Sequence, residues 1–196
     1  MHAQAAASGA LRMTASRDNA AALAAGRLVA AATGGDLNAF EDLVRGMQRR
    51  VYGFAYQQLR DYDEAQDLTQ EIFVKLYRNL DRYDAERPFE PWFWKLAANT
   101  SINYRRKRVP PPVEQPADHE SAAAAPESFE HDPALVGALS QLDLSYRLPL
   151  LLHYYADLSL QQVALTLSLS VPAIKSRLHR ARAILRNALA ELEGSR

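Results

Sequence analysis

The sequence LSLQQVALTLSLSVPAIKSRLHRAR, residues 158–182, is typical of two helices joined by a tight turn. Ser159 and Ser170 are each suited to cap a helix, because a serine hydroxyl accepts hydrogen bonds from free N–H groups of the first turn. Pro172 fits the first turn of the second helix, where its missing N–H is not needed. A helix of about eight residues, a turn around Ser168 and a second helix together predict a helix-turn-helix.

The second helix of this pair is strongly basic. Residues 171–186 hold five Lys or Arg residues and no acid. We expect the two helices to pack through apolar residues, namely Val163, Ala164, Leu167, Val171, Ile174 and Leu178. That packing leaves an outer face of Lys175, Ser176, His179 and Arg180. Such a face enters the DNA major groove, where cations bind phosphates and donate to guanine edges. A charged face that is merely solvated is the alternative.

The rest of the chain also has helical spacing. Apolar residues at i, i+3, i+4 and i+7 predict a helix from Phe40 to Ala55, following the stop-start signal Gly34-Gly35-Asp36, and further helices at 63–80 and from Pro91 onward. An Ala-rich helix is expected at 19–33, and two more at 135–142 and 146–155. Pro149 fits the last of these only within its first turn. The pattern is all-α.

The charge is segregated along the chain although the formal net charge is +0. Residues 110–133 hold six acids and no Lys or Arg, and they follow the basic run 105–108. This stretch is rich in Pro, Ala, Glu and Ser and poor in apolar groups, which is typical of a flexible linker. We therefore expect two small helical domains. The predicted segments are a disordered arm at 1–18, a bundle at 19–108, a linker at 109–133 and a helix-turn-helix domain at 134–194.

Composition excludes several classes of protein. The chain has no cysteine, no apolar run approaching the ~20 residues that span a bilayer, and no secretory signal pattern. The five His are scattered, and no paired-carboxylate, nucleophile or phosphate-loop pattern is present. We expect a cytoplasmic protein that is not an enzyme and has no metal, no cofactor and no membrane contact of its own.

Aromatic residues gather between 77 and 104. We expect Trp92 and Phe93 in the core, whereas Tyr83 and Phe89 fall in a predicted loop and Trp94 on another helical face together with Asn99, Asn103 and Arg106. Aromatic groups beside Asn and Arg hold unstacked bases in single-stranded nucleic-acid sites. This pattern favours a second nucleic-acid contact in the N-terminal domain.

The order DYDEAQDLTQEIFVKLYRNL, then RPFEPWFWKLAANTSINYRRKR, then a Pro-rich linker, then the helix-turn-helix resembles the extracytoplasmic-function (group 4) sigma factors of bacterial RNA polymerase. The resemblance covers residues 26–190. It departs from the family pattern at the turn, where Ser168 replaces the usual Gly.

The resemblance implies a role for each segment. Asp67, Leu68, Gln70 and Glu71 would dock on the β′ clamp helices of core polymerase. The loop from Tyr83 to Phe89 would capture a flipped base of the −10 element, with Asn99, Asn103 and Arg106 reading around it. Lys175, Ser176, His179 and Arg180 would read the −35 element, while other faces of this domain meet the β flap.

The function that the resemblance implies is transcription initiation. The protein would direct core polymerase to promoter DNA and help to melt it. A separate anti-sigma factor would control it by covering both domains, either from outside or wedged between them. A helix-turn-helix regulator that acts outside polymerase is the alternative. That alternative needs a ligand pocket or phosphoacceptor domain, for which the N-terminal half offers no pattern.

Overall fold

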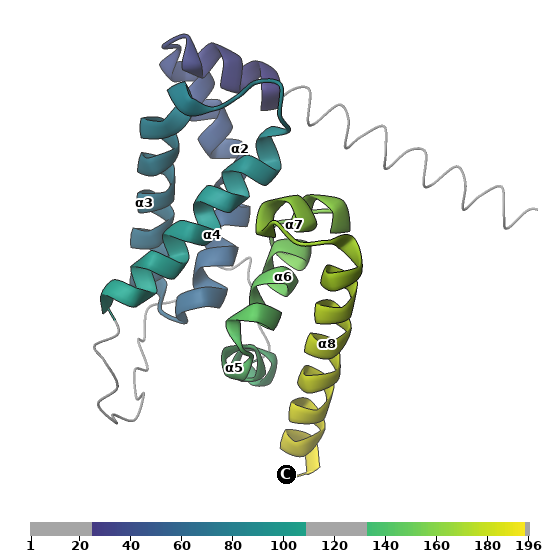
Figure 1. The fold of residues 1–196 in the computed structure, drawn as a ribbon. Helices are drawn as coiled ribbons and strands as arrows, with labels where there is room; N and C mark the ends of the chain where they lie inside the picture. Colours follow the sequence, from purple (N-terminus) through teal and green to yellow (C-terminus); the bar gives the residue numbers. More distant parts are fainter. Residues whose placement is uncertain (1–24, 109–132, 195–196) are drawn as a thin grey trace, which may run out of the picture.

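The computed structural model describes residues 25–108 and 133–194, and every element in these ranges is helical. The predicted arm at 1–18 and the predicted linker, apart from Pro133, lie outside the described residues. The N-terminal module contains helical residues 25–33, α2 (Leu37–Leu59), α3 (Tyr62–Asn79), the short 3-10 helix η1 (Leu80–Arg82) and α4 (Phe89–Arg108). Figure 1 shows α2, α3 and α4 side by side on one side of the molecule.

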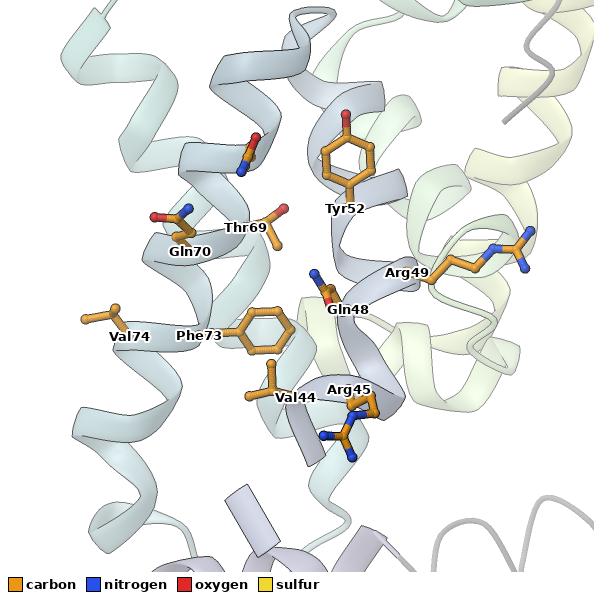
Figure 2. Close-up of a pocket in the computed structure, with 10 residues that line it drawn as sticks. Val44, Arg45, Gln48, Arg49, Tyr52, Thr69, Gln70, Phe73 and Val74 are labelled. Carbon is orange, nitrogen blue, oxygen red and sulfur yellow. The ribbon is translucent and has the colours of Figure 1, made fainter. Parts of the chain in front are cut away.

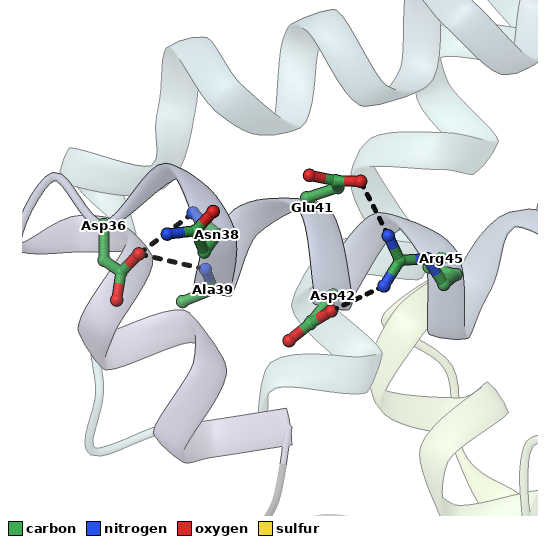
Figure 3. A network of polar contacts seen from close by, with 6 residues as sticks. All are labelled: Asp36, Asn38, Ala39, Glu41, Asp42 and Arg45. Atoms are coloured by element: carbon green, nitrogen blue, oxygen red, sulfur yellow. Dashed lines mark hydrogen bonds and ion pairs between the residues drawn. The ribbon is translucent and has the colours of Figure 1, made fainter.

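The beginning of α2 follows the predicted stop-start signal. Gly35 has a φ of +92°, a backbone conformation that side chains disfavour, and so it turns the chain after residues 25–33. The Asp36 carboxylate accepts from the backbone N–H groups of Asn38 (2.9 Å) and Ala39 (3.2 Å), as Figure 3 shows. Arg45, about two turns into the helix, pairs with Glu41 and Asp42 on its exposed face. Local capping thus sets where α2 starts.

The core of the N-terminal module is formed by the inward faces of α2, α3 and α4. Leu68 and Ile72 of α3 are fully buried, as are Phe54 of α2 and Phe93 and Trp94 of α4. Phe54 and Trp94 meet edge to face, with ring centroids 5.5 Å apart. The helices predicted from the spacing of apolar residues are therefore confirmed, and their apolar faces form this core.

The C-terminal module contains α5 (Pro133–Gln141), α6 (Leu144–Tyr154), α7 (Leu160–Leu167) and α8 (Val171–Gly194). Ser159 and Gln162 form a capping box at the start of α7, and the Ser170 hydroxyl accepts from the Ala173 N–H (3.3 Å) in the first turn of α8. Between them Ser168 has a φ of +55°, in the left-handed region. The predicted helix-turn-helix is confirmed, with both caps and the turn where the sequence places them.

The prediction for Pro149 was wrong. The helix begins at Leu144, with the Asp143 carboxylate accepting from the Ser145 N–H (2.8 Å), so Pro149 is its sixth residue and lies beyond the first turn. Proline has no N–H, so the carbonyl of Ser145, four residues earlier, receives no helical hydrogen bond from it. Pro149 is buried, and its apolar ring contributes to the packing of α6.

The two modules contact each other through α4 and α7, which lie next to each other in Figure 1. The hydroxyl of Thr166 in α7 is buried and donates to the carbonyl of Pro91 in α4 (3.5 Å). Lys95, one turn further along α4, donates to the Ser168 hydroxyl (3.3 Å). Arg50 of α2 donates to the carbonyl of Ala156, just after α6. The described modules therefore form a closed arrangement.

The closed arrangement also brings like charges together. Arg147 of α6 is 4% exposed, and burial lowers its pKa to about 10, with repulsion from Arg105 of α4 and Arg60 at the end of α2 acting in the same direction. Cations of both modules thus lie within electrostatic reach of one buried guanidinium. This repulsion opposes the contacts that hold the modules together.

Candidate functional site

The first candidate site is a groove between α2 and α3, shown in Figure 2. Val44 of α2 and Phe73 and Val74 of α3 are its apolar lining residues, and Val44 and Phe73 lie between the two helices. Val74 is 46% exposed although it is apolar. Polar groups from both helices complete the lining: Arg45, Gln48, Arg49, Tyr52, Gln66, Thr69 and Gln70. An apolar strip between polar rims is the surface that an amphipathic helix of another protein binds.

The four residues predicted to dock on polymerase differ in how exposed their side chains are. Gln70 lines the groove and is exposed, and Asp67 is exposed close to it. Glu71 is half-buried and forms an ion pair with Lys75, one turn later (2.8 Å). Leu68 was wrongly predicted as a contact, because it is fully buried in the core. It falls on the inward side of α3, one turn before Ile72, where it cannot reach a partner.

The second candidate site is an aromatic corner that joins η1 to α4. The ring of Tyr83 lies 5.6 Å from that of Phe89 and 5.0 Å from that of Trp92, centroid to centroid. The Tyr83 hydroxyl donates to the carbonyl of Arg87 (2.5 Å) across the loop. Burial of Tyr83 raises its pKa, with the charge of Asp84 adding to the effect. The loop is therefore shaped in advance by aromatic contacts and by hydrogen bonds within it.

Three aromatic assignments need correction. Phe89 was wrongly predicted as a loop contact: it is the first residue of α4 and is 5% exposed, because its ring packs against Phe93 (5.8 Å between centroids). Trp94 was wrongly predicted on an outer face, since it is fully buried against Phe54. Trp92 was predicted as core but is only partly buried and contacts Tyr83. Tyr83 and Trp92 are thus the accessible aromatic pair.

The polar residues predicted on α4 lie further along the helix. Asn99 and Arg106 are exposed, and Asn103, between them, is half-buried. Arg105 and Lys107 add positive charge near the end of α4. The structure leaves these side chains accessible in a row of helical turns beyond the aromatic corner, an arrangement that suits contact with a nucleic-acid strand.

The third candidate site is the outer face of α8. Lys175, Ser176, His179 and Arg180 are all exposed, whereas Ile174 and Leu178 are buried. Val163 and Ala164 of α7 are buried on the other side of the same packing, as predicted. The helix-turn-helix therefore presents four polar side chains outward on a rigid helix, with no acid among them, and this geometry fits the major groove.

Sequence reasoning missed the residues that α2 contributes to the groove. The apolar spacing of this helix was used only to predict the helix itself, and Val44, Arg45, Gln48, Arg49 and Tyr52 were assigned to no site. Their spacing of three to four residues, with polar and apolar groups mixed, was a signal for a half-exposed helix face. Only the packing of α3 beside α2 shows that this face lines a groove.

Within the described residues no helix is long and apolar enough to cross a membrane, and no group of three or more potential metal ligands is found.

Taken together, a helix-turn-helix with a basic outer face, an aromatic corner beside a polar helix and a groove with apolar and polar lining are typical of a two-module helical DNA-binding protein. The comparisons narrow this class. Residues 43–109 match the family model of sigma-70 region 2, and residues 134–185 match that of sigma-70 region 4.

Relatives with established names agree with the family models. The ECF RNA polymerase sigma factor SigW of Bacillus subtilis is 31% identical over 176 residues, which cover 81% of this chain and 92% of SigW. The RNA polymerase sigma-H factor of Pseudomonas aeruginosa is 31% identical over 179 residues, covering 81% of this chain and 90% of that protein. The solved structure of CnrH in complex with the cytosolic domain of CnrY has a TM-score of 0.67 and 26% identity, covering 86% of this chain and 98% of CnrH. The chain belongs to the extracytoplasmic-function sigma factors of RNA polymerase, and it acts in promoter recognition at transcription initiation.

Proposed function

We propose that the α2–α3 groove binds the β′ clamp helices of core RNA polymerase, that the Tyr83 corner and α4 act at the −10 element, and that α8 reads the −35 element. The observation that supports the proposal most directly is the exposed face of Lys175, Ser176, His179 and Arg180 on the second helix of a helix-turn-helix. The protein carries out no catalysis in this scheme. It acts in the cytoplasm, where core polymerase and promoter DNA are found.

The experiment that tests this function is transcription in vitro with purified core polymerase on genomic fragments, followed by mapping of start sites. Transcripts that depend on added protein support the sigma function and supply the promoter. Arg180→Ala then tests α8: loss of a base-edge contact costs about 1–3 kcal/mol and relaxes sequence preference at one position of the −35 element. Sequence-specific DNA binding without core polymerase, combined with no transcription, would favour a regulator outside polymerase instead.

The docking residues have a separate test. Charge reversal at Asp67 and Glu71, as Asp67→Lys and Glu71→Lys, is expected to weaken binding to core polymerase while leaving the helical content unchanged, because neither side chain is buried in the core. Unchanged affinity in a pull-down would remove these two residues from the docking surface.

The closed arrangement requires a change on promoter binding. Elements about 25 base pairs apart lie on the order of 80 Å apart along a straight duplex. Lys95 and Ser168, which belong to the two DNA-reading modules, are in hydrogen-bond contact at 3.3 Å. A chain closed in this way cannot reach both elements at once. We infer that binding to core polymerase separates α7 from α4.

The last part of the proposed function is regulation by a separate protein. We propose a helical anti-sigma partner that covers the α2–α3 groove and competes with core polymerase for it. A partner wedged between the modules would have to break the contacts that Thr166 and Lys95 make, whereas a partner on the groove leaves them intact. Competition between core polymerase and a candidate partner for the labelled protein tests this. Simultaneous binding of both would contradict it.

A further inference from the structure

Arg177 differs from the other described cations of α8 in where its side chain lies. Lys175, Arg180, Arg182 and Arg186 are exposed, whereas Arg177 is half-buried. Arg177 lies one turn before Ala181, which is fully buried, so it is on the side of α8 next to the buried stripe. The sequence alone counts it as one more basic residue of a DNA-reading helix. Its surroundings indicate a different role.

The group that Arg177 approaches is the backbone carbonyl that Pro149 leaves without a helical donor. In a regular helix the N–H of residue 149 would donate to the carbonyl of Ser145, and proline cannot. The Nη1 atom of Arg177 lies 3.5 Å from the Ser145 carbonyl oxygen and donates to it. The guanidinium of α8 therefore supplies the donor that α6 lacks.

The contact lies at a shallow surface groove where three elements meet. Leu144, Ser145, Leu148 and Pro149 of α6 line it together with Leu167 and Leu169 of the turn region and Arg177 of α8. Leu178, the next residue of α8, is buried. Apolar packing holds α8 against α6 but is tolerant of small rotations, whereas a hydrogen bond to one carbonyl has a direction. The contact thus restrains the rotation of α8 about its own axis.

We propose that Arg177 is a positioning residue for the recognition helix: it bonds the Ser145 carbonyl freed by Pro149 and thereby sets the orientation in which Lys175, Ser176, His179 and Arg180 meet DNA. This inference rests on the proposed function of α8 as the −35 reader. Contacts to base edges need side chains held within about 0.5 Å and 10–20° of their productive geometry. A tie between α6 and α8 close to Ser176 and His179 is well placed to supply that precision.

A double-mutant cycle tests the tie itself without any DNA. The four proteins are the wild type, Arg177→Met, Pro149→Ala and the double variant, each as the full chain. Arg177→Met keeps most of the apolar length and removes the donor, and Pro149→Ala supplies a backbone N–H for Ser145. We expect Arg177→Met to lower the midpoint of thermal unfolding in the proline background and to have a smaller effect in the alanine background. Equal effects in both backgrounds would overturn the proposed bond.

The same four proteins, bound to core polymerase, then test positioning. The probe is a duplex selected by the wild-type holoenzyme from a pool of randomised fragments. We expect Arg177→Met to weaken binding about three- to tenfold, with the slope of log affinity against log salt unchanged. We expect the double variant to remain as weak, because an N–H at residue 149 satisfies the Ser145 carbonyl without tying α8 to α6. A slope smaller by about 0.9 would identify Arg177 as a phosphate contact and overturn the proposal.

Two further variants separate this inference from the proposed function. Arg186→Met removes an exposed cation from the same helix. Its effect on the midpoint of thermal unfolding is expected to be the same whether residue 149 is proline or alanine. Arg180→Ala tests α8 as the reader. If Arg180→Ala leaves sequence preference unchanged, the assignment of α8 to the −35 element fails, and the positioning role fails with it. The double-mutant cycle on thermal unfolding still decides whether the bond between Arg177 and Ser145 exists. If Arg180→Ala relaxes the preference but Arg177→Met does not weaken binding, only the positioning role fails.

Discussion

Arg50 of α2 forms a two-pronged ion pair with Glu90 at the start of α4, with both nitrogen–oxygen distances at 2.8 Å. The same guanidinium donates to the carbonyl of Ala156 in the C-terminal module. One side chain therefore ties together two helices of the first module and the end of α6. Both members of the pair are about three-quarters buried, with exposed fractions of 29% and 25%, so water screens it less than a surface pair.

Arg50→Met is expected to loosen the contact between the modules. It removes the bond to Ala156 and the ion pair to Glu90, and a hydrogen bond to a charged donor contributes about 1.5–3 kcal/mol. The chain has no cysteine, so Lys95→Cys with Ser168→Cys introduces a unique pair of thiols between the modules. We expect a short bismaleimide to cross-link this pair efficiently, and less so after Arg50→Met or in the presence of core polymerase.

Leu37→Glu is the matched control for that measurement. Leu37 is 66% exposed at the start of α2 and takes no part in the described module contacts. It should leave the cross-linking yield unchanged. If Arg50→Met leaves the yield unchanged as well, Arg50 does not hold the modules together.

Val74→Glu is expected to weaken binding to core polymerase by tenfold or more. Val74 is the exposed apolar residue that lines the groove, and placing a charge where an apolar helix docks leaves that charge poorly solvated in the complex. The fold should tolerate the change because the side chain is already 46% exposed. Fluorescence anisotropy with labelled protein measures the affinity. Leu37→Glu adds the same charge to α2 outside the groove, and an equal loss with this variant would show that net charge, not the groove, decides affinity.

Tyr83→Ala is expected to impair promoter opening more than promoter binding. It removes the ring that contacts Trp92 and the hydroxyl that donates to the Arg87 carbonyl, so the loop loses these two restraints. Base–aromatic stacking contributes about 1–3 kcal/mol per base. Permanganate reactivity of −10 thymines measures opening, and a mobility shift measures the closed complex. Tyr83→Phe, which keeps the ring, should retain most of the opening; normal opening by Tyr83→Ala would show that this corner does not hold the base.

Ser159→Ala is expected to lower the free energy of unfolding of the C-terminal module by about 1 kcal/mol. Its hydroxyl accepts from the Gln162 N–H (3.3 Å), and the Gln162 amide oxygen accepts in turn from the Ser159 N–H (2.8 Å). Urea unfolding followed by circular dichroism measures the loss. Both tryptophans of the chain, Trp92 and Trp94, lie on α4, so tryptophan fluorescence follows the N-terminal module in the same samples. If Ser159→Ala lowers the urea midpoint by the same amount in circular dichroism and in tryptophan fluorescence, the modules unfold as one unit.

The helices and their caps followed from the sequence, because the information that defines them is local. Asp36, Ser159 and Ser170 cap the helices that their positions predicted. The outer face of α8 was also predictable, since a period of 3.6 residues puts Ile174 and Leu178 on one side and Lys175 and Arg180 on another. The order of the two sequence blocks was enough to indicate the family.

Only the tertiary structure decided which side of each helix meets another helix, because that depends on residues far away in the sequence. Leu68 and Trp94 are core and not contact residues because α2, α3 and α4 enclose them. Val44 and Gln48 line a groove because α3 lies beside α2. Arg177, on another helix, reaches the Ser145 carbonyl that Pro149 leaves without its helical donor. The contact of Lys95 with Ser168 joins residues of the two modules, and no local pattern encodes it.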